Sequence, residues 1–224
     1  MARLAQGAAD RAQALALRRQ VFRGGLATDE DGFDARCQHL LVLEGVELVA
    51  CARVLVLPAG TITASYSAQF YDLTPLRGFP GPVMELGRFC LRPGPDDPDI
   101  LRMAWAALTH LVDAAGVTLL FGCSSFPGID PAPHQAALAQ LVRHTANALW
   151  QPGAGSAERV AFPATTPAMA KMPPLLRSYL QLGAWVSDHA VIDRDLNTLH
   201  VFTGLEIAKV PAARARALRA LVQG

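Results

Sequence analysis

Glu85 is the candidate general base of this sequence. It lies in the apolar segment Val83-Met84-Glu85-Leu86-Gly87. Removal from water disfavours a charged carboxylate, so Glu85 must either pair with a cation or have a raised pKa. A carboxyl group of raised pKa is a suitable acceptor for the proton of an amine. A second interpretation stays open, in which Glu85 forms a buried ion pair that only fixes the sheet.

Arg53 and Arg88 are the candidate cations near Glu85, and either could serve a substrate instead. Arg53 lies in a predicted strand on the same face as Cys51 and Leu55, which aims a cation at a partly apolar surface. A guanidinium group can hold a carboxylate through two hydrogen bonds, so these arginines could bind a carboxylate of a substrate.

Strand geometry decides whether Glu85 and Arg88 can meet. In a regular strand the two side chains point to opposite faces, and they pair only if the strand bulges near Gly87. Such a bulge over residues 86–89 could also leave backbone N–H groups free to donate to an anion. Glycine at position 87 makes a close backbone approach easy.

Asp31 and Asp34 lie three residues apart in Asp31-Gly32-Phe33-Asp34. They could hold a substrate ammonium group, or they could simply form a turn. Arg18 interrupts the apolar face of a helix predicted over residues 10–23, and therefore requires an acidic partner. Phe22, on the same stripe of that helix, is interpreted from the pattern as a packing residue.

Length and composition limit the class of protein. A chain of 224 residues fits one ordinary domain, and 51% hydrophobic with 17% charged residues excludes a disordered or coiled-coil chain. The net charge of +1 removes a whole-molecule electrostatic case for binding nucleic acid. Its four cysteines are far apart and lack metal-ligand spacing, so we expect reduced thiols and no metal. No apolar run of about 18 residues occurs, and we expect a cytoplasmic protein.

The order of the predicted elements indicates a mixed α/β (α+β) fold, a single sheet covered by helices. Paired strands come first, and strands that alternate with helices follow. The patterns predict a β-hairpin of strands over 39–43 and 46–57, and further strands over 83–91, 117–123, 184–193 and 198–207. Besides the helix over 10–23, they predict a helix that opens at Asp97-Pro98 and runs through Leu111 to a stop at Gly116, helices over 131–150 and 173–182, and a terminal helix over about 211–222. Residues 152–167 are predicted as a loop.

The motifs together resemble known acyltransferases. The first set resembles the signature of acyl-homoserine-lactone synthases and their relatives in the acetyltransferase-like GNAT superfamily: Arg18, Phe22, Asp31-Gly32-Phe33-Asp34, Arg53 and Glu85-Leu86-Gly87-Arg88-Phe89. A second set resembles the hemolysin-like ornithine-acyl carrier protein N-acyltransferases, the first enzymes of ornithine-lipid synthesis: Phe70-Tyr71-Asp72-Leu73, residues 121–131, Pro173-Pro174-Leu175-Leu176, residues 179–184 and Asn197-Thr198. The resemblance covers residues 15–207.

This resemblance implies a GNAT-like fold and amide formation. A 3-hydroxyacyl chain would pass from the phosphopantetheine thioester of acyl carrier protein to the α-amino group of ornithine, giving a lyso-ornithine lipid without a metal or a permanently bound cofactor. We expect Glu85 and Arg88 as catalytic residues. The expected substrate-binding residues are Arg18, Phe22, Asp31, Asp34 and Arg53.

The donor is inferred from the loop over residues 92–99. GNAT enzymes that use coenzyme A usually carry a Gly-rich loop here, whose N–H groups bind a pyrophosphate. In this chain the loop contains prolines, which lack a donor, and aspartates, which repel a pyrophosphate. The loop therefore favours a carrier-protein thioester over coenzyme A.

A basic C-terminal tail is the candidate docking surface for an acidic carrier protein. The tail has no acidic residue after Glu206, and its cations are Lys209, Arg214, Arg216 and Arg219. The same tail also carries apolar residues and could instead rest on anionic lipid of the cytoplasmic membrane face. A solvated helix that only packs on the sheet is the third possibility.

Three other functions stay open from the sequence. The acceptor could be glutamine or lysine, which would give another aminolipid. The first motif set also allows acyl-homoserine-lactone synthesis, although the late motifs favour the lipid branch. A catalytically silent acyl-binding module is the alternative outside enzymology.

Overall fold

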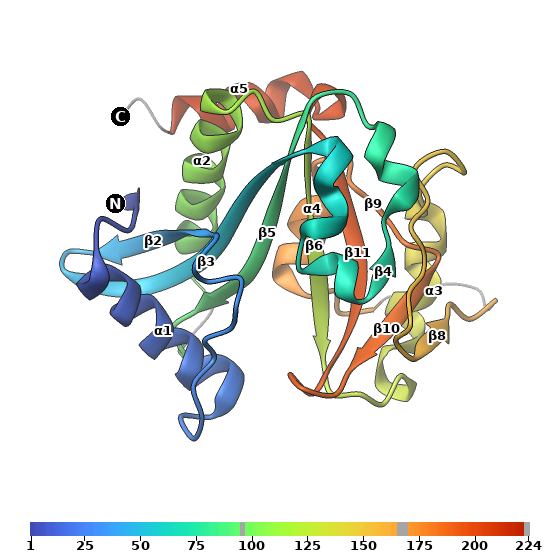
Figure 1. The fold of residues 1–224 in the computed structure, drawn as a ribbon, viewed down its shortest axis with the longest axis horizontal. Coiled ribbons are helices and arrows are strands. Elements are labelled where there is room, and N and C mark those ends of the chain that lie inside the picture. Colours follow the sequence, from blue (N-terminus) through green and yellow to red (C-terminus); the bar gives the residue numbers. More distant parts are fainter. Residues whose placement is uncertain (95–96, 165–169, 222–224) are drawn as a thin grey trace. The chain divides into compact units, whose positions relative to one another are not determined.

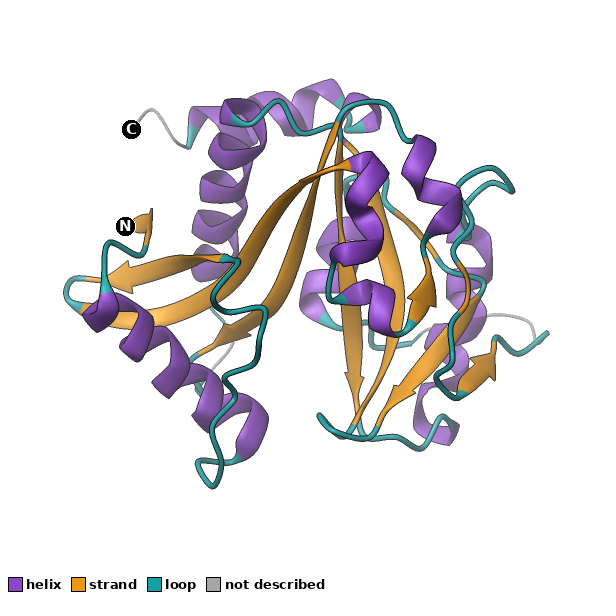
Figure 2. Cartoon of the chain, in the orientation of Figure 1, coloured by secondary structure: helices purple, strands orange, loops and turns teal. Residues whose placement is uncertain are grey.

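The structure is a computed structural model that describes residues 1–94, 97–164 and 170–221, and it divides into two compact units (Figure 1). The first unit comprises Met1–Val56, Met84–Val117 and Ala212–Gly224, and the second comprises Leu57–Val83 and Thr118–Pro211. Each unit combines strands with helices (Figure 2), as a mixed α/β fold requires. The organisation as a single domain, expected from the length, stays a prediction.

The strands of the first unit follow the order β1-β2-β3-β5. They are β1 (Ala2–Leu4), β2 (Gln38–Glu44), β3 (Glu47–Pro58) and β5 (Pro82–Leu91). β1 with β2 and β2 with β3 pair antiparallel, and Gly45 takes a positive φ of 59° in the tight turn that joins β2 to β3. The predicted hairpin is therefore confirmed.

Helices lie on both faces of these strands. Ala14 and Leu17 of α1 (Ala8–Arg23) pack against Leu41 and Cys51, whereas Ala104 of α2 (Pro98–Ala114) packs in a separate cluster with alternate residues of the same strands. Side chains alternate between the two faces of a strand, so α1 shares its face with every second residue of β3. Arg53 follows Cys51 by two positions and therefore lies on the α1 face. α5 (Ala212–Ala220) completes the unit.

The second unit is built on a mostly antiparallel sheet in the order β6-β11-β10-β8, with β9 paired to β11. These strands are β6 (Leu119–Pro127), β8 (Arg159–Ala161), β9 (Trp185–Val186), β10 (His189–Asp193) and β11 (Thr198–Glu206). Leu138 of α3 (Gln135–Leu141) and Leu176 of α4 (Pro174–Gln181) pack against Val201 of β11 in one core cluster. A separate small sheet pairs β4 (Tyr71–Asp72) with β7 (Gly153–Ala154).

Short 3-10 helices link these elements. They are η1 (Ala59–Ala64), η2 (Ser67–Gln69), η3 (Thr74–Gly78), η4 (Ala132–His134), η5 (Val142–His144) and η6 (Ile207–Lys209). Asp97 caps α2 by accepting a hydrogen bond from the Asp99 N–H at 2.8 Å, and Pro98 opens the helix. The helix start predicted at Asp97-Pro98 is confirmed.

Three sequence predictions of local structure are wrong. The helix expected to reach Trp150 ends at Leu141, because Thr145 is extended and the Asn147 side chain accepts hydrogen bonds from two following N–H groups. The strand expected over 184–193 breaks at Ser187, whose hydroxyl donates to the His189 carbonyl and accepts from the Phe202 N–H. The loop expected over 152–167 contains β7 and β8, and its residues 165–167 lie outside the described residues.

Candidate active site

Charged side chains of the first unit form one buried network on the α1 face. The arginines come from α1, β3 and β5, and the aspartates come from the segment between α1 and β2. The members are Arg18, Asp29, Asp31, Asp34, Arg53 and Arg88. A helix, a loop and two strands are therefore tied together by ion pairs.

Arg18 is the buried centre of this network, with 1% of its surface exposed. Its Nε donates to Asp29 at 2.8 Å, and its terminal nitrogens donate to the Asp34 carboxylate and the Asp29 carbonyl. Burial disfavours the charged guanidinium, but the hydrogen bonds with Asp34 and Asp29 outweigh it and raise the pKa of Arg18. The acidic partner that Arg18 requires is thus supplied twice. Its assignment to substrate binding stays a prediction.

Asp34 is fully engaged by the protein. Burial opposes its charge, yet the Arg18 hydrogen bond, the Asp31 N–H and the charges of Arg18 and Arg53 lower the pKa of Asp34 to about 2. Its carboxylate is therefore ionised at neutral pH. His39 lies beside it, with Nε2 3.4 Å from the Asp34 carbonyl oxygen, and burial lowers the pKa of His39.

Asp31 differs from Asp34 in its exposure, since 28% of its side-chain surface is accessible. Its Oδ1 accepts from Arg53 Nη1 at 2.6 Å and from the Phe33 N–H at 2.8 Å, and its Oδ2 is 3.5 Å from Arg88 Nη2. Asp31 therefore bridges the two arginines and still reaches solvent. A substrate could approach the network from this side.

Arg88 interrupts the regular geometry of β5. Its φ is +50°, a left-handed conformation that costs a non-glycine residue about 1–2 kcal/mol and that breaks the alternation of side chains along a strand. Its Nε donates to Asp29 at 3.0 Å, and its guanidinium carbon lies 5.8 Å from the centre of the Phe22 ring. Phe22 thus supports Arg88 through a cation–π contact.

Glu85 is buried in β5, with 4% of its surface exposed. Glu85 influences the pKa of the nearby Cys37 thiol. Burial is the largest cause that raises the pKa of Cys37 to about 11, and the charge of Arg53 opposes that rise. The charges of Glu85, Asp34 and Asp31 add to the rise. Glu85 therefore shares the surroundings of one thiol with three members of the network. The predicted residues Glu85, Arg88, Arg18, Phe22, Asp31, Asp34 and Arg53 all lie in this region.

Asp29 is the network member that the sequence did not predict. Only 2% of its surface is exposed, although it lies in the polar run Thr28-Asp29-Glu30-Asp31. Such a run is typical of a solvated loop, and it carries no periodicity that would mark one residue as buried. The one weak indication in the sequence was that several arginines lie in apolar segments and need acidic partners, so a further buried carboxylate could be expected.

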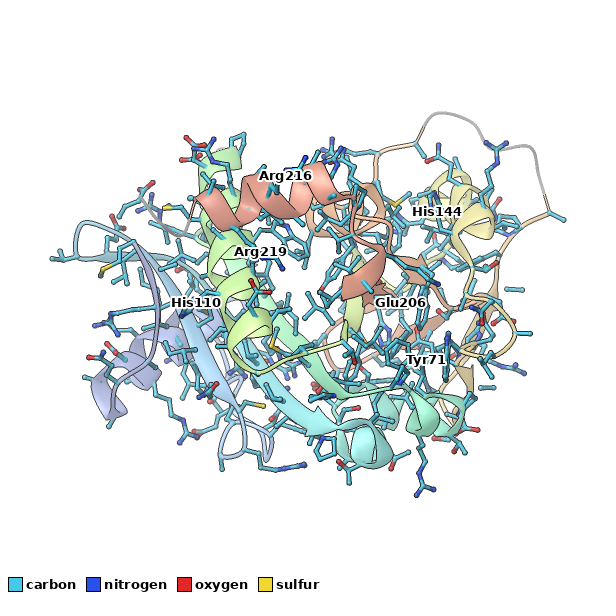
Figure 3. The ribbon with its side chains drawn as sticks, turned by 90° about the horizontal axis from the view of Figure 1, so that it is seen from above. Tyr71, His110, His144, Glu206, Arg216 and Arg219 are labelled. Atoms are coloured by element: carbon cyan, nitrogen blue, oxygen red, sulfur yellow. The ribbon has the colours of Figure 1, made fainter. Side chains whose placement is uncertain are left out.

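The predicted docking residues differ in their contacts with the rest of the protein. Arg219 of α5 binds Asp113 of α2 through two hydrogen bonds of 2.7 and 2.8 Å, and Lys209 of the second unit donates to Glu206 at 2.9 Å. Figure 3 labels Arg216 and Arg219 on α5 and His110 on α2. Arg214 and Arg216 are exposed, and no residue of α5 is buried. α5 is therefore a largely solvated helix held to α2 by Arg219.

Two searches of the described residues bear on cofactors and membranes. Within residues 1–94, 97–164 and 170–221, no group of three or more His, Cys, Asp or Glu side chains is arranged to hold a metal ion. In the same ranges, no helix combines the length and the apolar character needed to cross a bilayer.

Comparisons with known proteins agree with this geometry. Residues 17–106 match the acetyltransferase (GNAT) domain. The chain is 34% identical to the L-ornithine N(alpha)-acyltransferase of Rhodobacter capsulatus, covering 77% of this chain and 72% of that protein, and 33% identical to that of Rhizobium meliloti, covering 93% and 80%. The solved structure of FeeM, an N-acyl amino acid synthase from uncultured soil microbes, has the same fold, with a TM-score of 0.55, 12% identity and coverage of 100% of this chain and 96% of that one.

The network thus lies within the segment that matches the GNAT domain, and the curated relatives extend over most of the chain. The resemblance inferred from the motifs is confirmed, and this protein is an acyltransferase that belongs to the family of L-ornithine N(alpha)-acyltransferases.

Proposed function

We propose that this enzyme transfers a 3-hydroxyacyl chain from acyl carrier protein to the α-amino group of ornithine, forming a lyso-ornithine lipid. The curated relatives are named for acylation of the α-nitrogen of L-ornithine. The observation that carries the proposal is the buried network of ion pairs, together with Glu85, a buried carboxylate on the same strand as Arg88 of that network. That arrangement combines a base with groups that recognise a zwitterion.

The proposed reaction begins with loss of a proton from the α-ammonium group to the Glu85 carboxylate. The free amine attacks the thioester carbonyl, so a C–N bond forms and the tetrahedral oxyanion then collapses with cleavage of the C–S bond. The pantetheine sulfur leaves as a thiol after it takes up a proton, and one proton in total is released to solvent. N–H groups of β5 around Gly87 and Arg88, where the strand is irregular, are suitable donors to the oxyanion.

The network also supplies recognition of the amino acid. Arg53 and Arg88 flank Asp31, and a substrate carboxylate that joins them would form charge-assisted hydrogen bonds. We assign the δ-ammonium group of ornithine to Asp31, because it is the partly exposed carboxylate and its Oδ2 has a long 3.5 Å contact to Arg88. Asp34 accepts a hydrogen bond from the Asp31 N–H and is itself paired with Arg18, so both residues hold Asp31 in place.

We propose acyl carrier protein rather than coenzyme A as the donor. Arg92, at the start of the loop that precedes α2, pairs with Glu44 and Glu47, so its charge is already partly neutralised. Asp96, one of the aspartates behind this inference, lies outside the described residues. The exposed cations Arg214 and Arg216 offer an acidic carrier protein a complementary surface. Since the product carries a fatty chain, we expect its release at the cytoplasmic face of the membrane, with the enzyme in peripheral contact there.

Release of free thiol from 3-hydroxyacyl carrier protein tests this proposal. The purified chain should accelerate thiol release with ornithine more than with lysine or glutamine, and an acyl-coenzyme A donor should be used poorly. Faster release with glutamine or lysine would reassign the acceptor. An unchanged rate with every amino acid would contradict the proposed activity.

A further inference from the structure

Asp29 has more cationic partners than any substrate-facing group of the network. Its Oδ2 accepts from Arg18 Nε at 2.8 Å and from Arg88 Nε at 3.0 Å, and its Oδ1 accepts from Arg23 Nε at 3.2 Å. Its backbone carbonyl accepts a further hydrogen bond from Arg18. None of its side-chain surface is exposed, so the carboxylate acts only on protein groups.

The bond between Asp29 and Arg88 has a geometric consequence. Nε is the guanidinium nitrogen nearest the main chain. A hydrogen bond at Nε therefore leaves the two terminal nitrogens available for other partners. One of them, Nη2, lies 3.5 Å from Asp31, the partly exposed carboxylate of the network. The orientation that Asp29 imposes therefore directs the outer end of Arg88 toward the side from which a substrate can approach.

The main chain of Arg88 makes such an anchor necessary. A left-handed residue within a strand sends its side chain away from the direction that regular alternation would give. Backbone strain of this kind persists only where the surroundings fix it. Asp29 and the Phe22 ring both contact the Arg88 guanidinium and help to fix it.

From this geometry we infer that Asp29 is a positioning residue, which acts on the reaction through Arg88. The inference rests on the proposed role of Arg88 in the active site. Asp29 does not touch the substrate. It fixes the guanidinium in the orientation that binds the amino acid beside Glu85, and its loss leaves Arg88 charged but misdirected.

A double-mutant cycle on kcat/KM for ornithine tests this inference. Asp29→Asn should lower kcat/KM by about 100-fold, the scale of a misplaced binding group. Arg88→Gln should lower it at least as much, and the double variant should be no worse than Arg88→Gln alone, because the inferred effect of Asp29 on the substrate passes through Arg88. Losses that multiply would overturn the inference, since they would mean that Asp29 acts independently of Arg88.

Arg23→Gln is the matched control. It removes a cation from the other oxygen of Asp29 and leaves the Arg88 contact in place. We expect kcat/KM within about 2-fold of the wild-type value, because Asp29 keeps its hydrogen bonds with Arg18 and Arg88 in this variant. A loss as large as that of Asp29→Asn would show that the network responds to any lost charge, and would overturn the specific role of Arg88.

Arg88→Lys covers the case in which Asp29→Asn does not fold. Lysine keeps the positive charge but has no Nε–H in the position that Asp29 binds, so a loss of about 100-fold is again expected. Wild-type activity in Arg88→Lys would overturn the inference. Failure of the proposed role of Arg88 is distinguishable, because Arg88→Gln would then be as active as the wild type.

Discussion

Each unit of the protein contains a group of buried polar side chains, and the two groups differ in charge. The first unit buries ions: Arg18 and Asp34 are paired, charged and connected to the partly exposed Asp31. In the second unit, one buried polar pair is neutral. The Tyr71 hydroxyl donates to the His200 carbonyl at 3.0 Å and lies 3.2 Å from His200 Nδ1, and burial lowers the pKa of His200 to about 3. Figure 3 labels Tyr71 in the second unit.

The difference separates a site from a structural core. Neutral polar groups need only hydrogen bonds to be buried without loss of stability, and the Tyr71 hydroxyl and His200 Nδ1 have them, whereas His200 Nε2 has no hydrogen-bond partner among the described residues. Buried ions cost desolvation free energy that hydrophobic packing would avoid, so a network that reaches solvent at one carboxylate indicates a functional demand. We therefore assign chemistry to the first unit and architecture to the second.

Replacing Glu85 should have the largest effect on activity. Glu85→Gln keeps the size of the side chain but removes the proton acceptor, so turnover should fall by about two to four orders of magnitude. Steady-state thiol release at saturating ornithine measures this. Near-normal turnover would remove Glu85 from the mechanism and weaken the contrast between the units.

Replacing Asp31 and replacing Asp34 should have different effects on the protein. Asp31→Asn should raise the KM for ornithine by about 10- to 100-fold, because a charge-assisted hydrogen bond to the δ-ammonium is lost, and should lower stability less than Asp34→Asn, because Asp31 is partly exposed. Asp34→Asn removes one partner of buried arginines and should instead destabilise the protein by about 3–5 kcal/mol. Kinetics with ornithine and urea unfolding of both variants check this. Equal effects of the two changes would contradict the assignment of the ammonium site.

Tyr71→Phe is the counterpart of Glu85→Gln in the second unit. It removes the hydroxyl that bonds to His200 and leaves buried acceptors unsatisfied, so stability should fall by about 1–3 kcal/mol while kcat stays near the wild-type value. Urea unfolding and thiol release, measured on the same preparation, test both parts. A folded variant with strongly reduced kcat would place chemistry in the second unit.

The buried histidine of the second unit should make stability depend on pH. The pKa of His200 is about 3 in the folded chain against an ordinary 6.5, so the unfolded chain binds more protons between these values. The stability linked to neutral His200 is complete above pH 6.5 and is lost as pH falls toward 3. His200→Gln should flatten the dependence of unfolding free energy on pH between 7.5 and 5. An unchanged slope would contradict this.

Charge reversal on α5 should have the smallest effect. Arg214→Glu with Arg216→Glu should raise the apparent KM for carrier protein several-fold, and the effect should shrink as salt is added. Arg219 is left intact because it binds Asp113. The exposed pair Arg143→Glu with Arg177→Glu is the charge-matched control. The same KM in both variants would return α5 to a structural role.

Local signals predicted most of the fold. Two apolar runs separated by Glu44-Gly45 predicted the β2–β3 pair, and a run after a Pro/Gly-rich turn predicted β5. Asp97-Pro98 marked the start of α2. The end of α3 at Leu141 could not be predicted, because the chain after it stays apolar and the stop comes from Asn147 and a 3-10 turn. β8 was missed because a three-residue strand depends on its neighbour β10 rather than on its own pattern.

The candidate site was predictable as residue types but not as contacts. The motif identified Arg18, Asp31, Asp34 and Glu85 as a set, and the structure brings them into one region. Which carboxylate is buried and which is exposed depends on the path of the segment between α1 and β2. The path of this segment follows no periodic sequence pattern, so the burial of Asp29 is visible only in the structure.

Fragment-ion mass spectrometry of the product made from ornithine and 3-hydroxyacyl carrier protein tests the central claim most directly. If the first unit presents the α-amine to the thioester while Asp31 holds the δ-ammonium, the acyl chain will be found on the α-nitrogen. A chain on the δ-nitrogen, or free 3-hydroxy acid released by water alone, would contradict the account.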